Sequence, residues 1–477
     1  MATKKDLVEA HSFSRRRLIT AFVSGAPGGR EVEPVKPGRI IIGGVALSVL
    51  LLAGAAIAGF LIGRPPAAWL EASSFIISKD TGEQYVVIEG GEDPMLQRVP
   101  NYVSAQLLLG QAELTPFTVR DKYIRQVRLG DDLGIEGAPA GMPDATDLVD
   151  DGWTACTGAG LGVKVSVQPE PEAQELRDSA FLVTSRGKLW LIASSGGVGS
   201  EPGRSYRFEM PQQDAQAGTV ANNLGFGAVA NAPEVSPGWL NLFPLGPALD
   251  FSEFGVDRAG QRVDYTAQDS TDLSGFRIGD LLEDPTGRFY LVGDEAPEVL
   301  DPFAALVYDA VGQRARPVDD VRWAFPDPSY PAEWPAERPR AVAGGALCAV
   351  LHPGVGTQQP IVSLGTDPTG SADPAELPEG SKDVDVAPSS GAYVLSSGDA
   401  ASGGGSPYVI DTKGSRYALV GPEVPGFIGY GDVEPPTVPS AWLKYFESGV
   451  PLSTNAARRV PADAPDETGS DEADSPS

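Results

Sequence analysis

The stretch IIIGGVALSVLLLAGAAIAGFLI, from Ile40 to Ile62, contains 23 residues without a charge. Folded as a helix, it is long enough to cross a hydrocarbon core of roughly 30 Å. Arg39 and Arg64 flank it on either side. We therefore predict one transmembrane helix at residues 40–62.

The residues before this stretch are basic. Residues 1–39 hold eight Lys or Arg side chains against four acids. By the positive-inside rule, this segment lies in the cytoplasm and the C-terminal body lies outside, which makes the chain a single-pass protein of the plasma membrane. A cleaved signal peptide is the alternative. Its apolar region has roughly 7–15 residues after a short basic start, so the longer segments found here favour a retained anchor.

Small residues recur within and just after the apolar stretch. Gly59 and Gly63 form a GxxxG spacing, which lets two membrane helices approach closely. We predict helix packing at this pair; the alternative is a Gly/Ala-rich span without a partner there.

The outer part of the chain is strongly acidic. The 477 residues carry a net charge of −28, and because residues 1–39 and Arg64 are net positive, the remainder carries about −33. Such a surface repels nucleic acid and anionic lipid headgroups, so we expect proteins or cations as partners and no nucleic acid. The 57 glycines and 43 prolines indicate many short elements joined by turns.

The sequence has two cysteines, Cys156 and Cys348, both on the predicted outer side, where disulfides persist. Since one pairing is available, we predict a bridge between them, with two buried free thiols as the alternative. The bridge would close a loop of about 190 residues and stabilise the fold by roughly 4–5 kcal/mol.

Histidine is almost absent. His352 is the one histidine in the predicted outer part, which excludes a zinc site built from several histidines and leaves one residue for a Ser-His-Asp apparatus. There is no GxSxG or HExxH motif. We predict no metal and no cofactor, we name no catalytic residue, and we expect His352 in a turn.

A turn motif recurs four times along the outer part. An apolar pair lies five and six residues before a glycine, an aromatic residue lies three after it, and further apolar residues follow. This pattern predicts β-hairpins in which the glycine supplies a positive φ. The turn glycines are Gly82, Gly187, Gly287 and Gly414, and the aromatic residues are Tyr85, Trp190, Tyr290 and Tyr417.

Helices are predicted after the hairpins. Residues 100–110 and 302–312 begin with proline and end with glycine, as short helices do. Shorter counterparts lie near 220–225 and 424–429.

A Trp-Leu pair with a glycine seven residues after the tryptophan occurs twice, at Trp239 and Trp442. The turn glycines and these tryptophans repeat with nearly equal spacing, which predicts an internal duplication with one cysteine in each half. The predicted class is therefore α+β: a transmembrane helix, then four hairpin/helix repeat domains around a β-rich core with pseudo-two-fold symmetry.

The predicted segments divide the outer part as follows. The repeats occupy 70–118, 176–249 with its tail, 275–316, and 386–455 with its tail. The core occupies 119–175 and 317–385. Residues 461–477 are rich in Asp, Glu, Pro and Ser and are predicted to be disordered. Residues 396–405 are predicted to form a loop.

The ordered set of features resembles the EccB family of type VII (ESX) secretion systems. The resemblance rests on Arg16 to Gly25, Pro37 to Arg39, the single span, Val99 to Gly110, the paired cysteines and Val438 to Leu452. It covers residues 12 to about 455, and no piece of it is a catalytic motif. The cytoplasmic part departs from the family pattern because it lacks a longer Arg-rich run.

The resemblance implies four repeat domains around a β-rich core crossed by a disulfide. It also implies a structural subunit of a membrane complex with EccC, EccD and EccE, which exports WXG100-type proteins, and self-association of the outer body. ATPase activity has been attributed to the family.

Two enzymatic alternatives and one binding alternative stay open. A phosphate-binding loop needs GxxxxGK[ST], whereas Gly187-Lys188 has Leu182 at the first glycine position and Leu189 after the lysine. The pairs Asp150-Asp151 and Asp319-Asp320 have the chemistry of a wall-cleaving glycosidase, but a chain with 64 acids contains such pairs by number alone. A wall-binding module using the hairpin aromatics is disfavoured, because those residues lie in apolar strands.

Overall fold

The fold was analysed in a computed structural model that describes residues 3–24, 37–62, 65–195, 203–266, 271–342, 346–367, 377–398 and 405–461. The chain divides into two compact units, residues 1–67 and 68–477.

The first unit contains two helices, α1 (Lys4–Ser24) and α2 (Pro37–Ile62). The sequence of the predicted span thus lies within α2. Among the described residues, no helix is long and apolar enough to span a membrane. The transmembrane helix and the single-pass topology therefore stay predictions. So does the packing role of Gly59 and Gly63; Gly63 lies outside the described residues.

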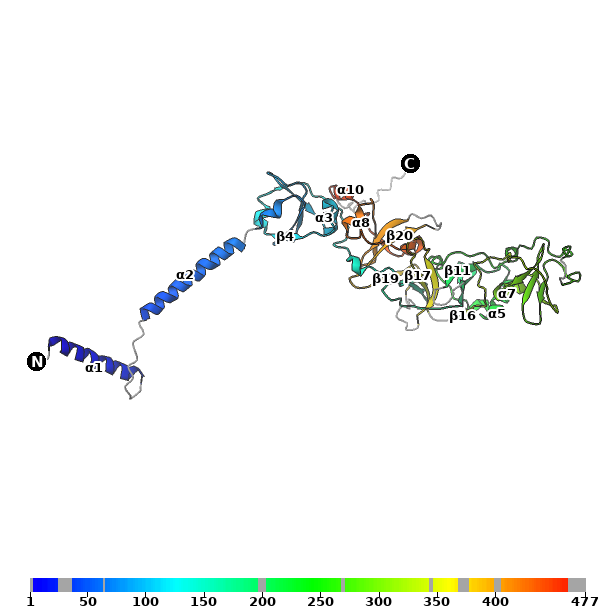
Figure 1. The fold of residues 1–477 in the computed structure, drawn as a ribbon, viewed down its shortest axis with the longest axis horizontal. Helices are drawn as coiled ribbons and strands as arrows, with labels where there is room; N and C mark the ends of the chain where they lie inside the picture. The colour runs from blue at the N-terminus through cyan, green and yellow to red at the C-terminus, as the bar shows by residue number, and fades with distance from the viewer. Residues whose placement is uncertain are drawn as a thin grey trace, which may run out of the picture. The chain divides into compact units, whose positions relative to one another are not determined.

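A short 3-10 turn, η1 (Ala67–Leu70), is followed by a five-stranded sheet ordered β4-β1-β2-β3-β5, of which Figure 1 labels β4. Strands β1, β2 and β3 form an antiparallel meander, and β4 and β5 join its two edges in parallel. The helix α3 lies between β3 and β4, and the short helix α4 lies between β4 and β5. The bounds are β1 (Ser74–Ser78), β2 (Gln84–Val87), β3 (Met95–Val99), α3 (Tyr102–Leu109), β4 (Pro116–Val119), α4 (Asp121–Ile124) and β5 (Arg128–Leu129).

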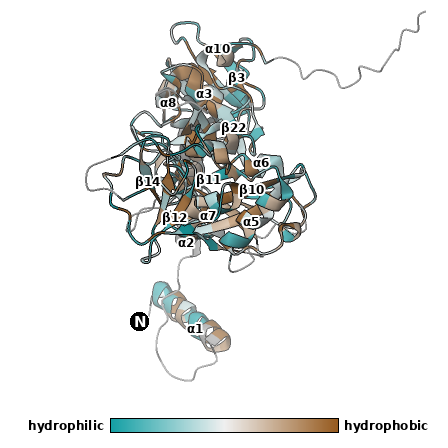
Figure 2. Ribbon diagram, turned by 90° about the vertical axis from the view of Figure 1, so that its right-hand side faces the viewer, coloured by the Kyte–Doolittle hydropathy of each residue, from teal (hydrophilic) through white to brown (hydrophobic). Residues whose placement is uncertain are grey.

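The predicted helix at residues 100–110 is α3. Asn101 caps it by accepting a hydrogen bond from the backbone N–H of Ser104, and Gly110 ends it in the left-handed conformation. Its ribbon is largely hydrophobic (Figure 2), because five of its eight side chains are apolar and it is buried on several sides.

Two four-stranded sheets, ordered β11-β10-β9-β16 and β14-β13-β12-β15, share one hydrophobic core. Their helices α5 and α7 lie together in that core. The bounds of the first sheet and its segment are β9 (Ser179–Ser185), β10 (Lys188–Ser195), β11 (Arg204–Glu209), α5 (Asp214–Leu224), η3 (Val229–Asn231), α6 (Pro237–Leu240), η4 (Phe251–Phe254) and β16 (Arg340–Ala341). Those of the second are β12 (Leu281–Glu283), β13 (Phe289–Val292), β14 (Pro297–Leu300), α7 (Pro302–Val311) and β15 (Arg316–Pro317).

The last sheet is ordered β23-β20-β21-β22-β24. Its topology is that of the first sheet, since β20, β21 and β22 form a meander whose edges are joined in parallel by β23 and β24. It shares a hydrophobic core with the first sheet and α3. The bounds are β20 (Ala392–Ser397), β21 (Ser406–Ile410), β22 (Ser415–Ala418), α8 (Val424–Phe427), β23 (Thr437–Pro439), α9 (Ser440–Leu443), β24 (Glu447–Ser448) and α10 (Thr454–Ala457).

A six-stranded sheet, ordered β19-β7-β6-β17-β18-β8, forms the core. It contains two hairpins, β6-β7 and β17-β18, whose first strands pair antiparallel at the centre. The strand after each hairpin pairs with the other hairpin: β8 joins β18, and β19 joins β7. The bounds are η2 (Ala145–Asp147), β6 (Trp153–Thr157), β7 (Val163–Val167), β8 (Gln174–Glu175), β17 (Leu347–His352), β18 (Ile361–Thr366) and β19 (Lys382–Val386).

The mixed α+β class is confirmed. Some boundaries differ from the prediction: the first sheet continues to Leu129 through α4 and β5, and β16, which lies within the predicted second core segment, pairs with β9 instead. Of the predicted acidic tail, Pro461 alone lies within the described residues.

Candidate functional site

The centre of the core sheet carries a disulfide between Cys156 on β6 and Cys348 on β17. The two residues are direct partners in the strand register, with Cα atoms 4.0 Å apart, although 192 residues separate them in sequence. Both are fully buried. The bond therefore joins two segments of the second unit that are remote in sequence, at the middle of the sheet.

The segment before and through β8 covers this disulfide. Ala173 packs with the two cysteines and Val350 in a small apolar cluster. On one side of it, Lys164 of β7 pairs with Glu172, with 3.7 Å between Nζ and Oε2. Because both side chains are largely buried, this pair fixes the segment against the sheet.

At the other end of the segment, His352 is held between two carboxylates. Its Nδ1 lies 3.2 Å from Oδ1 of Asp151, and its Nε2 contacts Oε1 of Glu175 on β8. These hydrogen bonds, first that to Asp151 and then that to Glu175, raise the pKa of His352 to about 9 despite its burial. Burial alone would raise the pKa of Asp151, but the hydrogen bond with His352 helps to lower this pKa below its ordinary value.

His352 is thus a charged clamp and not a general base. Both ring nitrogens are occupied by acceptors, and a protonated imidazole has no lone pair with which to take a proton. The residue closes β17 and is not in a turn, contrary to the prediction. Sequence reasoning missed this contact because Asp151 and Glu175 are remote in sequence and resemble the many other acids.

The four predicted turn glycines all have positive φ, between 73° and 82°. Gly82, Gly187 and Gly287 lie in the first turn of their meanders, between β1 and β2, β9 and β10, and β12 and β13. Gly414 lies between β21 and β22, which is the second turn of its meander. The fourth copy therefore differs from the others by one strand.

The tyrosines three residues after these glycines hydrogen-bond to carboxylates of their own hairpins. Tyr85 donates to Glu83 at 2.6 Å, and Tyr290 donates to Asp284 at 2.9 Å. Tyr417 donates to Asp411 at 3.3 Å. All three rings are buried. At these three positions the aromatic residue therefore stabilises the hairpin and is not an exposed surface for sugar binding. Trp190, at the fourth position, is half-buried, with the Arg207 guanidinium 5.8 Å from its ring centre.

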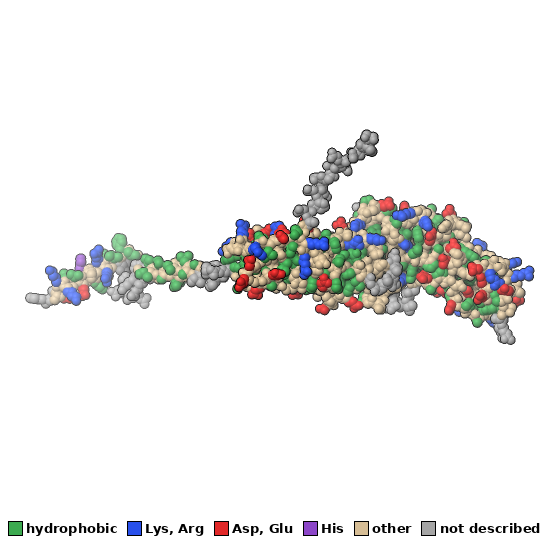
Figure 3. Space-filling view, turned by 90° about the horizontal axis from the view of Figure 1, so that it is seen from above, with side chains coloured by type: hydrophobic (Ala, Val, Ile, Leu, Met, Phe, Trp, Pro, Cys, Tyr) green, Lys and Arg blue, Asp and Glu red, His purple; other side chains and the backbone are tan. Residues whose placement is uncertain are grey.

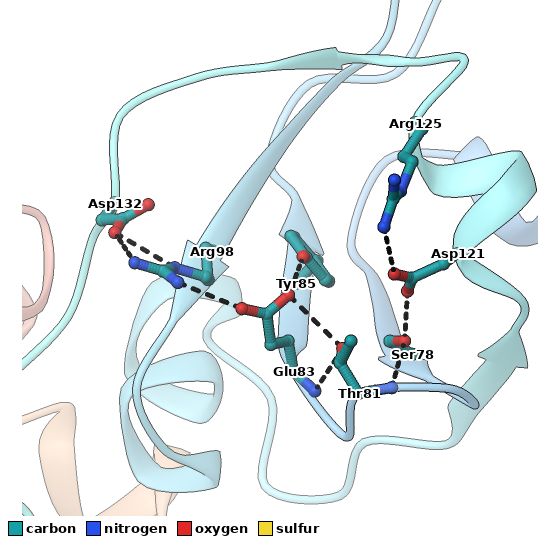
Figure 4. Close-up of polar contacts among 8 residues, drawn as sticks. All are labelled: Ser78, Thr81, Glu83, Tyr85, Arg98, Asp121, Arg125 and Asp132. Atoms are coloured by element: carbon teal, nitrogen blue, oxygen red, sulfur yellow. Dashed lines mark hydrogen bonds and ion pairs between the residues drawn. The ribbon is translucent and has the colours of Figure 1, made fainter.

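Around the first hairpin, two polar chains fix the neighbouring segments (Figure 4). Arg98 bridges Glu83 and Asp132, at 3.1 Å from Oε1 of the former. The hydrogen bond from Tyr85, and then that from Arg98, lower the pKa of Glu83. A groove of about 380 Å³ opens beside this network, partly lined by Arg98, Asp132 and Glu136.

The second polar chain holds α4 on the hairpin. Ser78 donates to Asp121, which also pairs with Arg125 at 3.4 Å (Figure 4). The backbone N–H of Asp121 donates to Asp80. Asp121, the first residue of α4, is thus bound to the end of β1 and the β1–β2 turn through Ser78 and Asp80, and to Arg125 at the end of its own helix.

The two Trp-Leu pairs lie against the core sheet. Trp239 of α6 and Trp442 of α9 are fully buried in the same core cluster. Trp239 donates from Nε1 to the carbonyl of Ala155 at 2.8 Å. The structure reveals a third copy that sequence reasoning missed: Tyr123-Ile124 of α4, with Gly130 seven residues after the tyrosine.

The glycine of each copy packs against the third strand of the antiparallel meander in its sheet, which is β3, β11 or β22. A Cβ on Gly130, Gly246 or Gly449 would lie 2.8, 2.4 or 2.3 Å from a side-chain atom of that strand. The side chains concerned are Met95, Phe208 and Tyr417. The sequence signal of this third copy is the aromatic-to-glycine spacing, with tyrosine at the position that tryptophan has in the other two.

Several residues quoted for the enzymatic alternatives have structural contacts. Gly187-Lys188 lies at the turn of a β-hairpin and not before a helix. Asp151 is engaged by His352, and Asp320 pairs with Arg322 at 2.5 Å. Within the described ranges, no cluster of three or more His, Cys, Asp or Glu side chains could hold a metal ion.

Solved structures share this fold. A chain of an intact ESX-5 inner membrane complex is 20% identical with a TM-score of 0.60, covering 100% of this chain and 98% of that one. A chain of the EccB3 dimer from the ESX-3 core complex is 21% identical with a TM-score of 0.59, covering 81% and 100%. The architecture is therefore that of chains found in ESX membrane complexes.

Curated relatives match a smaller share of this chain than the solved structures do. The proteins named ESX-1 secretion system ATPase EccB1 are 26% identical over 220 residues in Mycolicibacterium smegmatis and 27% over 222 residues in Mycobacterium tuberculosis. These matches span 43–44% of this chain and 41–42% of the relatives. The sequence model described as type VII secretion system ESX-1, transport TM domain B, matches residues 1–464. The chain belongs to this family, the EccB family.

Proposed function

We propose that the chain is a structural, membrane-anchored subunit of a type VII (ESX) secretion complex, which supports assembly of the complex and export of WXG100-type proteins across the inner membrane. The observation that carries this proposal is the fold match to a chain of an ESX-5 inner membrane complex over 100% of this chain. The family match over residues 1–464 supports it independently.

In this proposal, residues 40–62 form the anchor, residues 1–39 face the cytoplasm, and the body from residue 68 lies outside the plasma membrane. Its partners are membrane components of the EccC, EccD and EccE types. The outer body associates with a second copy, as a solved relative described as a dimer does.

The body itself is proposed to be four repeats around a duplicated core. The shared topology of the first and last sheets supports this, as do the three copies of the aromatic-to-glycine segment. The exchange of β8 and β19 between the two core hairpins supports the pseudo-two-fold relation.

ATP hydrolysis by this chain is the second candidate, because the curated relatives are named ATPases. The Gly187-Lys188 turn disfavours it, and we assign the energy supply to the EccC-type partner. Nucleotide turnover by the purified full chain, with a series of acid-to-amide variants, separates the two candidates. Turnover that persists through purification and vanishes with one carboxylate would favour the enzyme.

Co-purification tests the structural role. From solubilised native membranes, the chain should purify with EccC-, EccD- and EccE-type proteins, and its deletion should abolish export of WXG100-type substrates. A complex that purifies intact without this chain, with unchanged export, would refute the proposal.

A further inference from the structure

The third copy of the aromatic-to-glycine segment, in the first sheet, has a different surface from the other two. In the copies at α6 and α9, the indoles of Trp239 and Trp442 are fully buried against the core sheet. The corresponding Tyr123 of α4 is only partly buried, in a small cluster that includes Trp69 and Ile124. The core sheet does not belong to that cluster, so this copy presents its outer side to the surroundings.

This copy also carries a different charge. Arg120, Lys122, Arg125 and Arg128 are all exposed, with Asp121 as the one acid among residues 120–130. Residues 237–246 contain no charged side chain, and residues 440–449 contain Lys444 and Glu447. Since the three segments have the same place in their sheets, the positive charge is specific to this one and is not required by the fold.

The positive side chains are available to an external anion. Arg125 lies 3.4 Å from Asp121 with 79% of its side chain exposed, and Arg128 lies 3.5 Å from Asp93 with 61% exposed. Ion pairs this exposed contribute roughly 0–1 kcal/mol, so an external anion competes readily. Asp121 is moreover held by Ser78 (Figure 4). The face of the molecule seen in Figure 3 carries acidic and basic side chains interspersed.

Apolar and aromatic groups lie among these cations. The ammonium of Lys122 lies 4.6 Å from the centre of the Tyr123 ring, and Leu129 on the edge strand β5 is 56% exposed. Cations combined with a tyrosine and an exposed leucine are typical of surfaces that lie at a membrane interface.

The segment packs with η1, the turn that follows the predicted anchor in the sequence. The turn η1 packs in the same cluster as Ile124, and residues 63–66 alone separate η1 from α2. Few residues of sequence therefore join the predicted anchor to this cluster.

We infer that Arg120, Lys122, Tyr123, Arg125, Arg128 and Leu129 form a lipid-contacting surface, the α4–β5 surface, which binds anionic headgroups of the outer leaflet. The inference rests on the anchor in the proposed function. The cations bind headgroup phosphates, while Tyr123 and Leu129 lie at the apolar boundary. The acidic body as a whole is repelled by such lipids, so this surface selects which side of the body faces the membrane.

Hydrogen exchange of the full chain in lipid nanodiscs tests this inference. One set of discs contains phosphatidylcholine alone, and the other contains roughly a third phosphatidylglycerol. We expect exchange in residues 120–129 to slow about tenfold in the anionic discs, while residues 237–246 and 440–449 are unchanged. In about 1 M salt, where the Debye length is roughly 3 Å, the difference should disappear.

A matched pair of variants completes the test. Replacing Arg120, Lys122, Arg125 and Arg128 by Gln should abolish the difference between the discs. The same change of charge at the exposed residues Arg262, Arg288, Arg314 and Arg338 should leave it unchanged. Equal exchange in both kinds of disc would overturn the inference. Protection that requires partner subunits and is the same in neutral and anionic lipid would overturn it too. Failure of the chain to enter discs would instead contradict the proposed anchor.

Discussion

Cys156 and Cys348 face each other as direct partners in the central strand pair of the core sheet. On either side of this pair the strands follow the same order, a hairpin partner and then the strand that comes from the other half. The covalent bond therefore joins equivalent places in the two hairpins. It crosses the central one of the three boundaries in the sheet at which strands remote in sequence pair.

Removing the disulfide should destabilise the body strongly. The double substitution Cys156→Ala and Cys348→Ala releases a loop of 192 residues, and chain entropy predicts a loss of about 5 kcal/mol. Denaturant unfolding of the detergent-solubilised full chain measures this loss. Mass spectrometry without reductant should also find the 156–348 peptide pair in the unmodified protein. An unchanged unfolding midpoint in the double variant would contradict this role.

The His352 clamp should make stability depend on pH. Its pKa is raised from 6.5 to about 9, so its contribution is complete below about pH 6.5 and is lost as the pH rises towards 9. Because the site is partly exposed, we expect a loss of about 1–2 kcal/mol, less than the shift alone implies.

The variant His352→Gln provides the comparison, since glutamine cannot carry the charge. It should be less stable than the unmodified chain near pH 6 and equal to it near pH 9 or above. Unfolding free energies measured across this range decide the matter. Parallel pH profiles of the two proteins would show that the clamp contributes nothing through its charge.

The sequence predicted the hairpins and the disulfide because their chemistry is local or limited in number. A glycine with positive φ between apolar runs has few other uses, and two cysteines allow one pair. For the same reason, the helix at residues 100–110 could be predicted from its proline and glycine.

Features that depend on distant partners could not be predicted. The exchange of β8 and β19 has no sequence signature, because both strands are short and their partners lie in the other half. The position of Gly414 in the second turn of its meander could not be predicted, because a turn glycine between apolar strands has the same sequence pattern in either turn. Tyr123 was missed because tyrosine replaces tryptophan where the core sheet does not cover the ring.

Alanine at the recurring glycines should be costly. A Cβ at position 449 would lie 2.3 Å from Cε1 of Tyr417, and one at position 246 would lie 2.4 Å from Cε1 of Phe208. Both close atoms belong to rigid aromatic rings that cannot easily move away. We therefore expect Gly449→Ala and Gly246→Ala each to lower the free energy of unfolding by about 2–3 kcal/mol. Gly426→Ala is the control, because a Cβ there meets nothing within 4 Å. Equal stabilities of the three variants would show that the close approach is not required.

The two buried tryptophans should respond differently to the same substitution. Both indoles are fully buried in one cluster, so Trp239→Phe and Trp442→Phe remove a similar volume. Trp239 also loses its hydrogen bond to Ala155, whereas the Nε1 of Trp442 has no partner among the described residues. The Trp239 variant should therefore be less stable than the Trp442 variant by about 1 kcal/mol, measured by denaturant unfolding of both. A larger loss at Trp442 would mean that its N–H is bonded in the folded protein and that the two halves are more alike than their contacts indicate.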